Sequence, residues 1–173
     1  MNQAVAREQL GVFLKTLKLP SFAADHGDVA RLATEESWSY ERYLAELCER
    51  EVADRQERRI ERLLRQSRLP LEKTKETLDE SKLTAKVRKQ LGTLYEGGFL
   101  KQAENVLTFG LPGRGKTHAM CAIGHELVRQ GHAVWFVAAY ELVQHLLRAK
   151  RELELERTIK RLDRFEAVLI DDI

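Results

Sequence analysis

The chain has 173 residues, of which 43% are hydrophobic and 32% are charged, and its formal net charge is +2. This length suits one large domain or two small ones, and the composition is typical of a globular protein. A net charge this small gives no argument, from composition alone, for a nucleic-acid partner. Any basic surface would have to be confined to part of the chain.

The two cysteines, Cys48 and Cys121, lack Cys-x-x-Cys spacing, which argues against a disulfide scaffold or a zinc site. Both fall in helical patterns, and we expect buried thiols. The first ten residues lack the apolar core of a signal peptide, and no apolar run approaches the roughly 20 residues that cross a bilayer. We therefore expect a cytoplasmic protein without a membrane partner.

The first part of the chain has the 3.6-residue hydrophobic period of helices. A first helix covers Leu10 to Leu17 and stops at Pro20, a second starts at Ser21, and a third runs from near Ser39 to Pro70. The polar stretch 72–81 is interpreted as a linker, and one more helix precedes the glycine pair at 97–98. These patterns predict a helical N-terminal domain at 1–78, followed by a linker and helix at 79–104.

The pattern changes at Asn105, where short apolar runs begin to alternate with helical segments. Strands are predicted at 105–110, 132–139 and 167–171, and helices at 116–129 and, in two pieces, at 140–163. This alternation predicts an α/β domain with a parallel sheet over residues 105–173.

Between the first strand and its helix lies GLPGRGKT, which fits the phosphate-loop pattern G-x-x-x-x-G-K-[ST]. In such loops, glycines let several backbone N–H groups point at one anion, and the helix that follows adds its positive end. Lys116 is predicted to reach the phosphates and Thr117 to ligate Mg²⁺. Arg114 is expected to point to solvent, since the loop acts through its backbone, and an extra phosphate contact is the alternative. A chance glycine-rich turn is the alternative, which the flanking strand and helix disfavour. The predicted phosphate-binding residues are Gly110, Leu111, Pro112, Gly113, Arg114, Gly115, Lys116 and Thr117.

The third predicted strand ends in two aspartates, as a Walker B element does. A buried strand brings such carboxylates to the carboxyl edge of the sheet, where ligands bind in α/β proteins. Asp171 is predicted to orient Mg²⁺ through water, and Asp172 to act as general base, with Lys116 as the other catalytic residue. The alternative is a core strand entering a turn, which the phosphate loop earlier in the chain makes the weaker interpretation.

These two motifs, with THAMCAIGHELVRQGHAVWFVAAYELVQHLLRAK between them, resemble the IstB-like helper ATPases of bacterial insertion sequences. The helical part is similar too, in LKTLKLPSFAA, in SYERYLAELCEREVADRQERRIERLLRQSRLP and in TLDES. That family is related to the DnaC helicase loaders and DnaA initiators of the AAA+ superfamily. The resemblance implies a P-loop AAA+ fold, use of ATP and Mg²⁺, self-association, assembly on double-stranded DNA and activation of a transposase.

The sequence departs from the family pattern in two ways. Leu111 and Arg114 replace the Pro and Thr of the usual GPPGTGKT loop. The family also continues past the Walker B element with a sensor strand, an arginine finger and a small helical portion, none of which can be assigned here. We therefore expect an incomplete domain from a truncated form, in which 105–110 lacks its inner neighbouring strand. ATPase turnover of this chain alone is expected to be little or none, which leaves its status as an enzyme open.

Two basic segments are candidates for sequence-independent, salt-sensitive DNA binding, since no helix-turn-helix or zinc pattern indicates base reading. In the long helix, Glu51, Asp54 and Glu61 stand four residues before Arg55, Arg58 and Arg65, so a self-paired solvated face is the alternative. The candidate DNA contacts are Arg59 and Arg62, which lack such a partner, with Arg148, Lys150, Arg151, Arg157, Lys160 and Arg161.

Two other functions stay open: a DnaC-like loader whose N-terminal helices bind a replicative helicase, and a non-hydrolysing helical interaction fragment.

The histidines near the loop have no partner at metal-ligand spacing and are interpreted as packing or surface residues. They are His118, His125, His132 and His145.

Overall fold

The computed structural model describes residues 3–172, which divide between Arg58 and Arg59 into two compact units. The first unit holds α1 (Gln3–Thr16), α2 (Pro20–Glu35) and the first part of α3 (Tyr40–Ser67). The predicted N-terminal helices are therefore present, and Pro20 occupies the first turn of α2, where its missing N–H costs nothing. The domain boundary at residue 78 stays a prediction.

The start of α2 is capped from α3 rather than by its own N-cap residue. Glu51 accepts a hydrogen bond from the Ser21 amide (2.9 Å), and Asp54 accepts one from the Ser21 hydroxyl (2.6 Å). Arg55 donates to Glu51 (2.7 Å) and to the carbonyl of Lys18, in the turn that follows α1 (2.7 Å). These side chains of α3 therefore satisfy backbone groups that the ends of α1 and α2 leave without helical partners.

Glu51 is the centre of this cap and is only 3% exposed. Burial opposes its ionisation, but hydrogen bonds from Arg55 and Ser21 outweigh burial and lower its pKa. The expected pair between Asp54 and Arg58 was wrong, because Asp54 turns to Ser21 and Arg58 lies 3.7 Å from Glu51.

The expectation of two buried thiols was half wrong. Cys121 is buried, but Cys48 is exposed. Leu47 occupies the buried face of α3, and the next residue along a helix points about 100° away from it.

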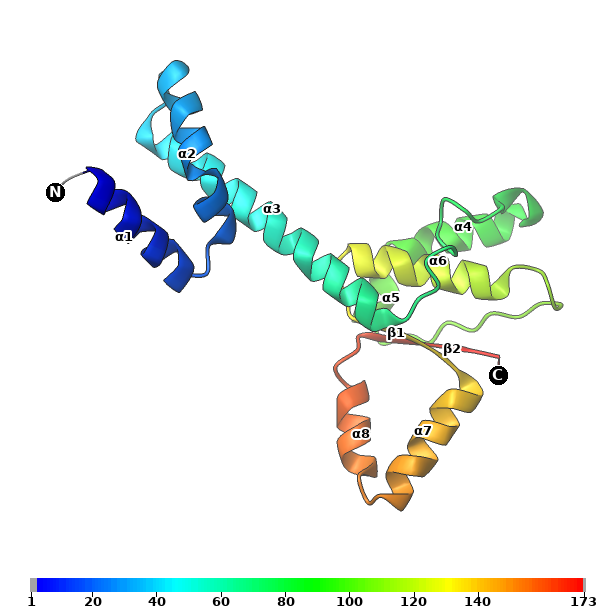
Figure 1. Cartoon of the computed structure of the whole chain (residues 1–173). Helices are drawn as coiled ribbons and strands as arrows, with labels where there is room; N and C mark the ends of the chain where they lie inside the picture. The colour runs from blue at the N-terminus through cyan, green and yellow to red at the C-terminus, as the bar shows by residue number, and fades with distance from the viewer. Residues whose placement is uncertain (1–2, 173) are drawn as a thin grey trace. The chain divides into compact units, whose positions relative to one another are not determined.

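The second unit is built around two parallel strands, β1 (Val134–Ala138) and β2 (Ala167–Asp171), paired from Val134 with Ala167 to Ala138 with Asp171. Figure 1 shows α4 (Ala85–Tyr95) and α6 (Lys116–Arg129) on one side of the strands. The connection α7 (Ala139–Arg151) and α8 (Leu155–Leu162) lies on the other. A 3₁₀ turn at Glu80–Lys82 and the short α5 (Gly98–Lys101) complete the unit. The α/β class is thus confirmed.

The core of this unit forms where α6 packs on the strands. Cys121, Ala122 and Leu127 of α6 have no exposed surface. A Cβ atom added at Gly124 would lie 2.9 Å from a methyl group of Leu69 and 3.0 Å from one of Leu169 in β2. Glycine at this position therefore lets α6 and β2 approach closely.

The strand predicted at 105–110 is not formed, and this expectation was wrong. Within residues 3–172 the sheet has two strands, and no ladder hydrogen bonds reach 105–110. The apolar residues Leu107 and Phe109 are 72% and 86% exposed. A β-prone sequence becomes a strand only when another strand pairs with it, and this segment has no strand beside it.

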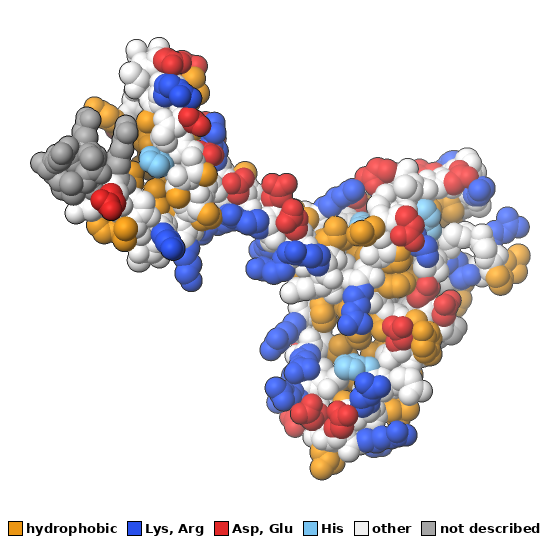
Figure 2. Space-filling model, viewed as in Figure 1, with side chains coloured by type: hydrophobic (Ala, Val, Ile, Leu, Met, Phe, Trp, Pro, Cys, Tyr) orange, Lys and Arg blue, Asp and Glu red, His pale blue; other side chains and the backbone are white. Residues whose placement is uncertain are grey.

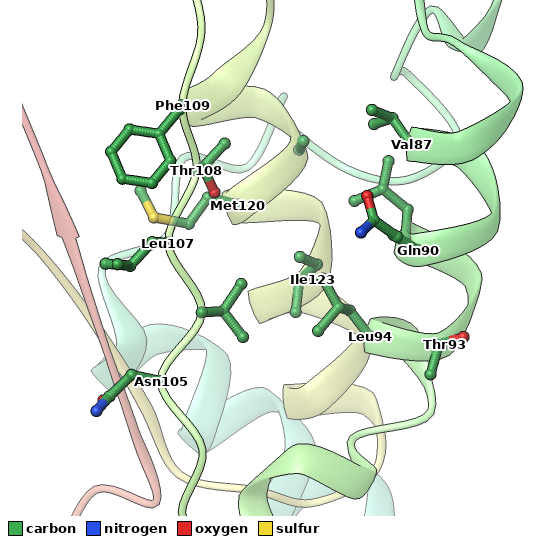
Figure 3. A pocket seen from close by; sticks show the side chains of 13 residues that line it. Val87, Gln90, Thr93, Leu94, Asn105, Leu107, Thr108, Phe109, Met120 and Ile123 are labelled. Carbon is green, nitrogen blue, oxygen red and sulfur yellow. The ribbon is translucent and has the colours of Figure 1, made fainter.

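The segment instead borders an apolar groove of about 540 Å³. Figure 3 shows 105–109 along one side of the groove and α4 along the other, with Met120 and Ile123 of α6 at its base. Sequence patterns did not predict this groove, since it follows from the failed pairing of 105–110.

Two further expectations concern the linker and the membrane. The polar stretch expected to be a linker is held against α6, because Arg129 forms an ion pair with Glu76 (2.7 Å). Among the helices within residues 3–172, none combines the length and apolar character that a bilayer crossing requires.

We predict that Glu51→Ala lowers the free energy of unfolding of the first unit by about 1–3 kcal/mol, because the buried Ser21 amide loses its acceptor. The matched control is Glu57→Ala at an exposed position of α3, which should change it little. Denaturant unfolding of both variants measures the difference. Because the Glu51 pKa lies below 4.5, its stabilisation is present above that pH and is lost as pH falls further. Equal effects of the two variants at pH 7 would contradict the cap.

We also predict that Gly124→Ala destabilises the second unit, since overpacking by one methyl group costs about 1–3 kcal/mol. The gain in helix propensity, about 1 kcal/mol, offsets only part of this cost. Gly92→Ala in α4 is the control, because a Cβ there meets no atom within 4 Å. Thermal unfolding should show a lower Tm for Gly124→Ala and an unchanged or higher one for Gly92→Ala; the reverse order would refute the packing argument.

Candidate phosphate and metal site

The predicted phosphate loop forms a tight turn that ends at the first residue of α6. Gly113 and Gly115 have φ values of 73° and 79°, in the left-handed region that other residues rarely adopt. Gly115 is the N-cap of α6 and contributes no side-chain cap. The amides of the first helical turn thus keep the positive end of the helix available to an anion.

Lys116 begins α6 and turns its ammonium group back over the loop. Its Nζ donates to the Leu111 carbonyl at 3.2 Å, so the charge lies beside the loop backbone. Leu111 and Arg114 are exposed, as is expected if the loop acts through its backbone. The two residues that depart from the family pattern therefore do not obstruct the turn.

Thr117 and Asp171 come together although 54 residues separate them in the sequence. The Thr117 hydroxyl donates to an Asp171 carboxylate oxygen at 2.9 Å. Helix α6 supplies the first group and the carboxyl end of β2 the second. A hydroxyl and a carboxylate are oxygen ligands of the kind that Mg²⁺ takes.

These two groups fit Mg²⁺ only as partial ligands. Within residues 3–172 no cluster of three or more His, Cys, Asp or Glu side chains could hold a metal ion by itself. Mg²⁺ typically retains waters and takes substrate phosphates besides one or two carboxylates. The donor set therefore suits an ion that arrives with a nucleotide.

Asp172 is exposed and adopts φ of 56° directly after β2. The left-handed backbone turns the chain out of the strand at this point. Among the described residues no hydrogen bond joins its carboxylate to Lys116 or Thr117, so its predicted role as general base stays a prediction.

Cys121 lies one turn along α6 from Thr117 and is not a reactive group. Burial raises the pKa of its thiol to about 11; Lys73 lowers it, while Asp171 and Glu72 raise it further.

The candidate DNA-binding residues are not all available. Arg59 was expected to lack an acidic partner four residues away, and its guanidinium instead donates to the Gly131 carbonyl at 3.1 Å. Arg157 and Lys160 pair with Glu154 (3.4 Å) and Glu156 (3.1 Å) on exposed surface. Within residues 3–172 no ion pair engages the remaining candidates, which are all exposed: Arg62, Arg148, Lys150, Arg151 and Arg161. Figure 2 shows Lys and Arg side chains over α7 and α8.

Three of the histidines make specific hydrogen bonds that sequence reasoning missed. His132 bonds to Glu166 (2.7 Å) at the start of the two strands, which lowers the pKa of Glu166. His118 and His125 bond to carbonyl groups of residues 70–74. The seven-residue spacing of these two places them on one face of α6, a signal that the sequence did contain.

The sequence matches known proteins whose names describe ATP binding. Residues 12–173 match the family of IstB-like ATP binding proteins. The chain is 36% identical over 174 residues to a Sinorhizobium fredii protein whose name describes an insertion sequence ATP-binding protein, covering all of this chain and 58% of that protein.

Two other relatives carry similar names, the ATP-binding proteins of insertion sequence IS5376 from Geobacillus stearothermophilus and of IS21 from Pseudomonas aeruginosa. The first is 31% identical over 96% of this chain and 66% of its own length. The second is 32% identical over 95% of this chain and 62% of its own length. The chain thus spans between 58% and 66% of these relatives. On the match over residues 12–173, the chain belongs to the family of IstB-like ATP-binding proteins.

Proposed function

We propose that the loop 110–117 binds the phosphates of ATP together with Mg²⁺. The observation that carries this proposal is the hydrogen bond between Thr117 and Asp171, because it joins the end of the phosphate loop to the acidic strand. Two motifs matched by chance would have no reason to meet in the fold. The family of ATP-binding proteins to which the chain belongs supports the same ligand.

Each residue then has one task. Phosphate oxygens would accept hydrogen bonds from loop and first-turn amides, and Lys116 would leave the Leu111 carbonyl to bind them. Thr117 would ligate Mg²⁺ and Asp171 would hold the ion through water. Mg²⁺, when bound, would neutralise part of the negative charge of the phosphates. Asp172, exposed at the carboxyl edge, is proposed to accept a proton from the water that attacks the γ-phosphate.

We further propose that the chain acts as an ATP-binding helper of DNA transposition in the cytoplasm. Relatives whose names describe insertion sequence ATP-binding proteins support this context. The family resemblance suggests ATP-dependent self-association, assembly on double-stranded DNA and activation of a transposase. These activities belong to whole proteins of the family and are proposals for this chain.

The surface of α7 and α8 is the proposed DNA contact. Arg148 and Arg151 end α7, and Arg161 lies in α8, all exposed to solvent. Such side chains can bind phosphates of the DNA backbone without reading bases, with an affinity that falls as salt rises. Arg59 is a weaker candidate, because its guanidinium is engaged with Gly131.

We predict that Lys116→Ala weakens binding of ATP by about 10- to 150-fold, since hydrogen bonds to charged groups contribute about 1.5–3 kcal/mol. Isothermal titration calorimetry with Mg²⁺-ATP measures this change. The matched control is Lys150→Ala, an exposed lysine of α7, whose Kd for ATP should equal that of the unchanged chain. Equal affinity in Lys116→Ala and in the control rules out the loop as the phosphate site.

We predict that Arg148→Gln/Arg151→Gln reduces the salt dependence of binding to double-stranded DNA by up to about 1.8 in slope, since each lost phosphate contact contributes about 0.9. Arg31→Gln/Arg42→Gln is the control, because these exposed arginines of the first unit pair with Asp28 and Glu36. Fluorescence anisotropy at several salt concentrations gives both slopes. If the salt dependence changes only in the control variant, the DNA contact does not lie on α7 and α8.

A further inference from the structure

Residues 70–78, which we call the strap, are fixed to one face of α6 by three side chains. His125 Nε2 lies 2.9 Å from the Pro70 carbonyl and His118 Nε2 lies 3.0 Å from the Thr74 carbonyl. Arg129 Nη1 donates to Glu76 at 2.7 Å. Because 118, 125 and 129 follow the helical repeat, these anchors line up along α6.

The hydrogen-bond directions at His118 are determined by its partners. A carbonyl only accepts, so the Nε2 atom of His118 carries the hydrogen. The Thr77 hydroxyl donates to the Glu72 carbonyl (2.7 Å) and accepts from the Thr74 amide (3.0 Å). Its oxygen also lies 3.1 Å from His118 Nε2. The imidazole of His118 therefore lies against a turn of the strap that Thr77 holds together by its own hydrogen bonds.

His118 also belongs to the first turn of α6, directly after the two residues of the candidate site. Three successive side chains of this turn reach three different places: Lys116 bonds to the loop at Leu111, Thr117 to Asp171 in β2, and His118 to the strap. The loop, the acidic strand and the strap thus meet at a single helical turn.

This turn is the end of a helix without a side-chain cap, and such ends are among the first parts of a helix to open. Phosphate binding needs the turn formed, because its amides bind the anion. Closure of the strap needs the same turn formed, because it carries His118. Two events that require the same local structure favour each other, and the coupling is reciprocal.

We propose that the strap responds to the nucleotide site through His118, so that ATP at the loop tightens the strap on α6. This inference rests on the proposed binding of ATP. His125 holds the start of the strap seven residues farther along the helix. It stabilises the strap without taking part in the coupling.

Hydrogen exchange of the strap amides in the full chain, with and without Mg²⁺-ATP, tests this coupling. The Thr74 amide is the main reporter, because Thr77 accepts its hydrogen bond. Saturating ATP should slow its exchange by at least about fivefold, the low end of typical couplings between sites. His118→Phe should still bind ATP, with a somewhat higher Kd, and should lose this response.

The matched variant is His125→Phe, which removes an equivalent bond to a strap carbonyl away from the loop. Its strap should exchange faster than in the unchanged chain without ATP, yet still slow on ATP addition. His118→Gln retains an N–H donor and should keep part of the response, which separates loss of the bond from loss of folding.

The outcomes are distinguishable. If the unchanged chain binds no ATP, the proposed function and this inference both fail. If it binds ATP but strap exchange stays the same, or if His118→Phe responds as fully as His125→Phe does, the inference alone is overturned.

Discussion

The close contact between α6 and β2 is the constraint on which the candidate site depends. It exists because residue 124 has no side chain, which leaves room for Leu169 of β2 against the helix. Thr117 lies seven residues before Gly124, on the same face of the helix. Asp171 lies two residues after Leu169, on the same face of the strand. Packing at the first pair therefore places the second pair within hydrogen-bond distance. A core contact between apolar groups thus positions the polar groups that we propose to hold a metal ion.

The same helix organises the surface around the site. One face of α6 packs on the strands, and another, bearing His118 and His125, holds residues 70–78. Its first turn begins at Gly115, whose left-handed backbone needs glycine. Helix α6 therefore links the conformation of the phosphate loop, the position of β2 and the order of the strap. A change at any one of them is expected to reach the others through the first turn.

Much of this could be predicted from the sequence, where the signal is local. The 3.6-residue period and Pro70 predicted α3, the GKT motif predicted the start of α6, and the two motifs together predicted that Thr117 and Asp171 share a site. Features that depend on distant partners could not be predicted. The strand-like residues of 105–110 predicted a strand although its inner neighbour was expected to be missing, and without a partner the strand does not form. The hydrogen bond from Arg59 could not be predicted, because its acceptor, the Gly131 carbonyl, is 72 residues away. The polar composition of 72–81 suggested a linker. That composition does not show that histidines of α6 bind the backbone of this part of the chain.

We propose that Thr117 and Asp171 act as one metal-binding unit. The most direct test is a double-mutant cycle of Thr117→Val and Asp171→Asn, with the affinity for ATP measured at saturating Mg²⁺ and again with a chelator. Residues that share one function are coupled, so the double variant should lose less affinity than the sum of the single losses, by about 0.5–3 kcal/mol. This coupling should be smaller without Mg²⁺, where the direct hydrogen bond between the two side chains remains as the link between them. Losses that add to within about 0.3 kcal/mol in Mg²⁺ would contradict the claim.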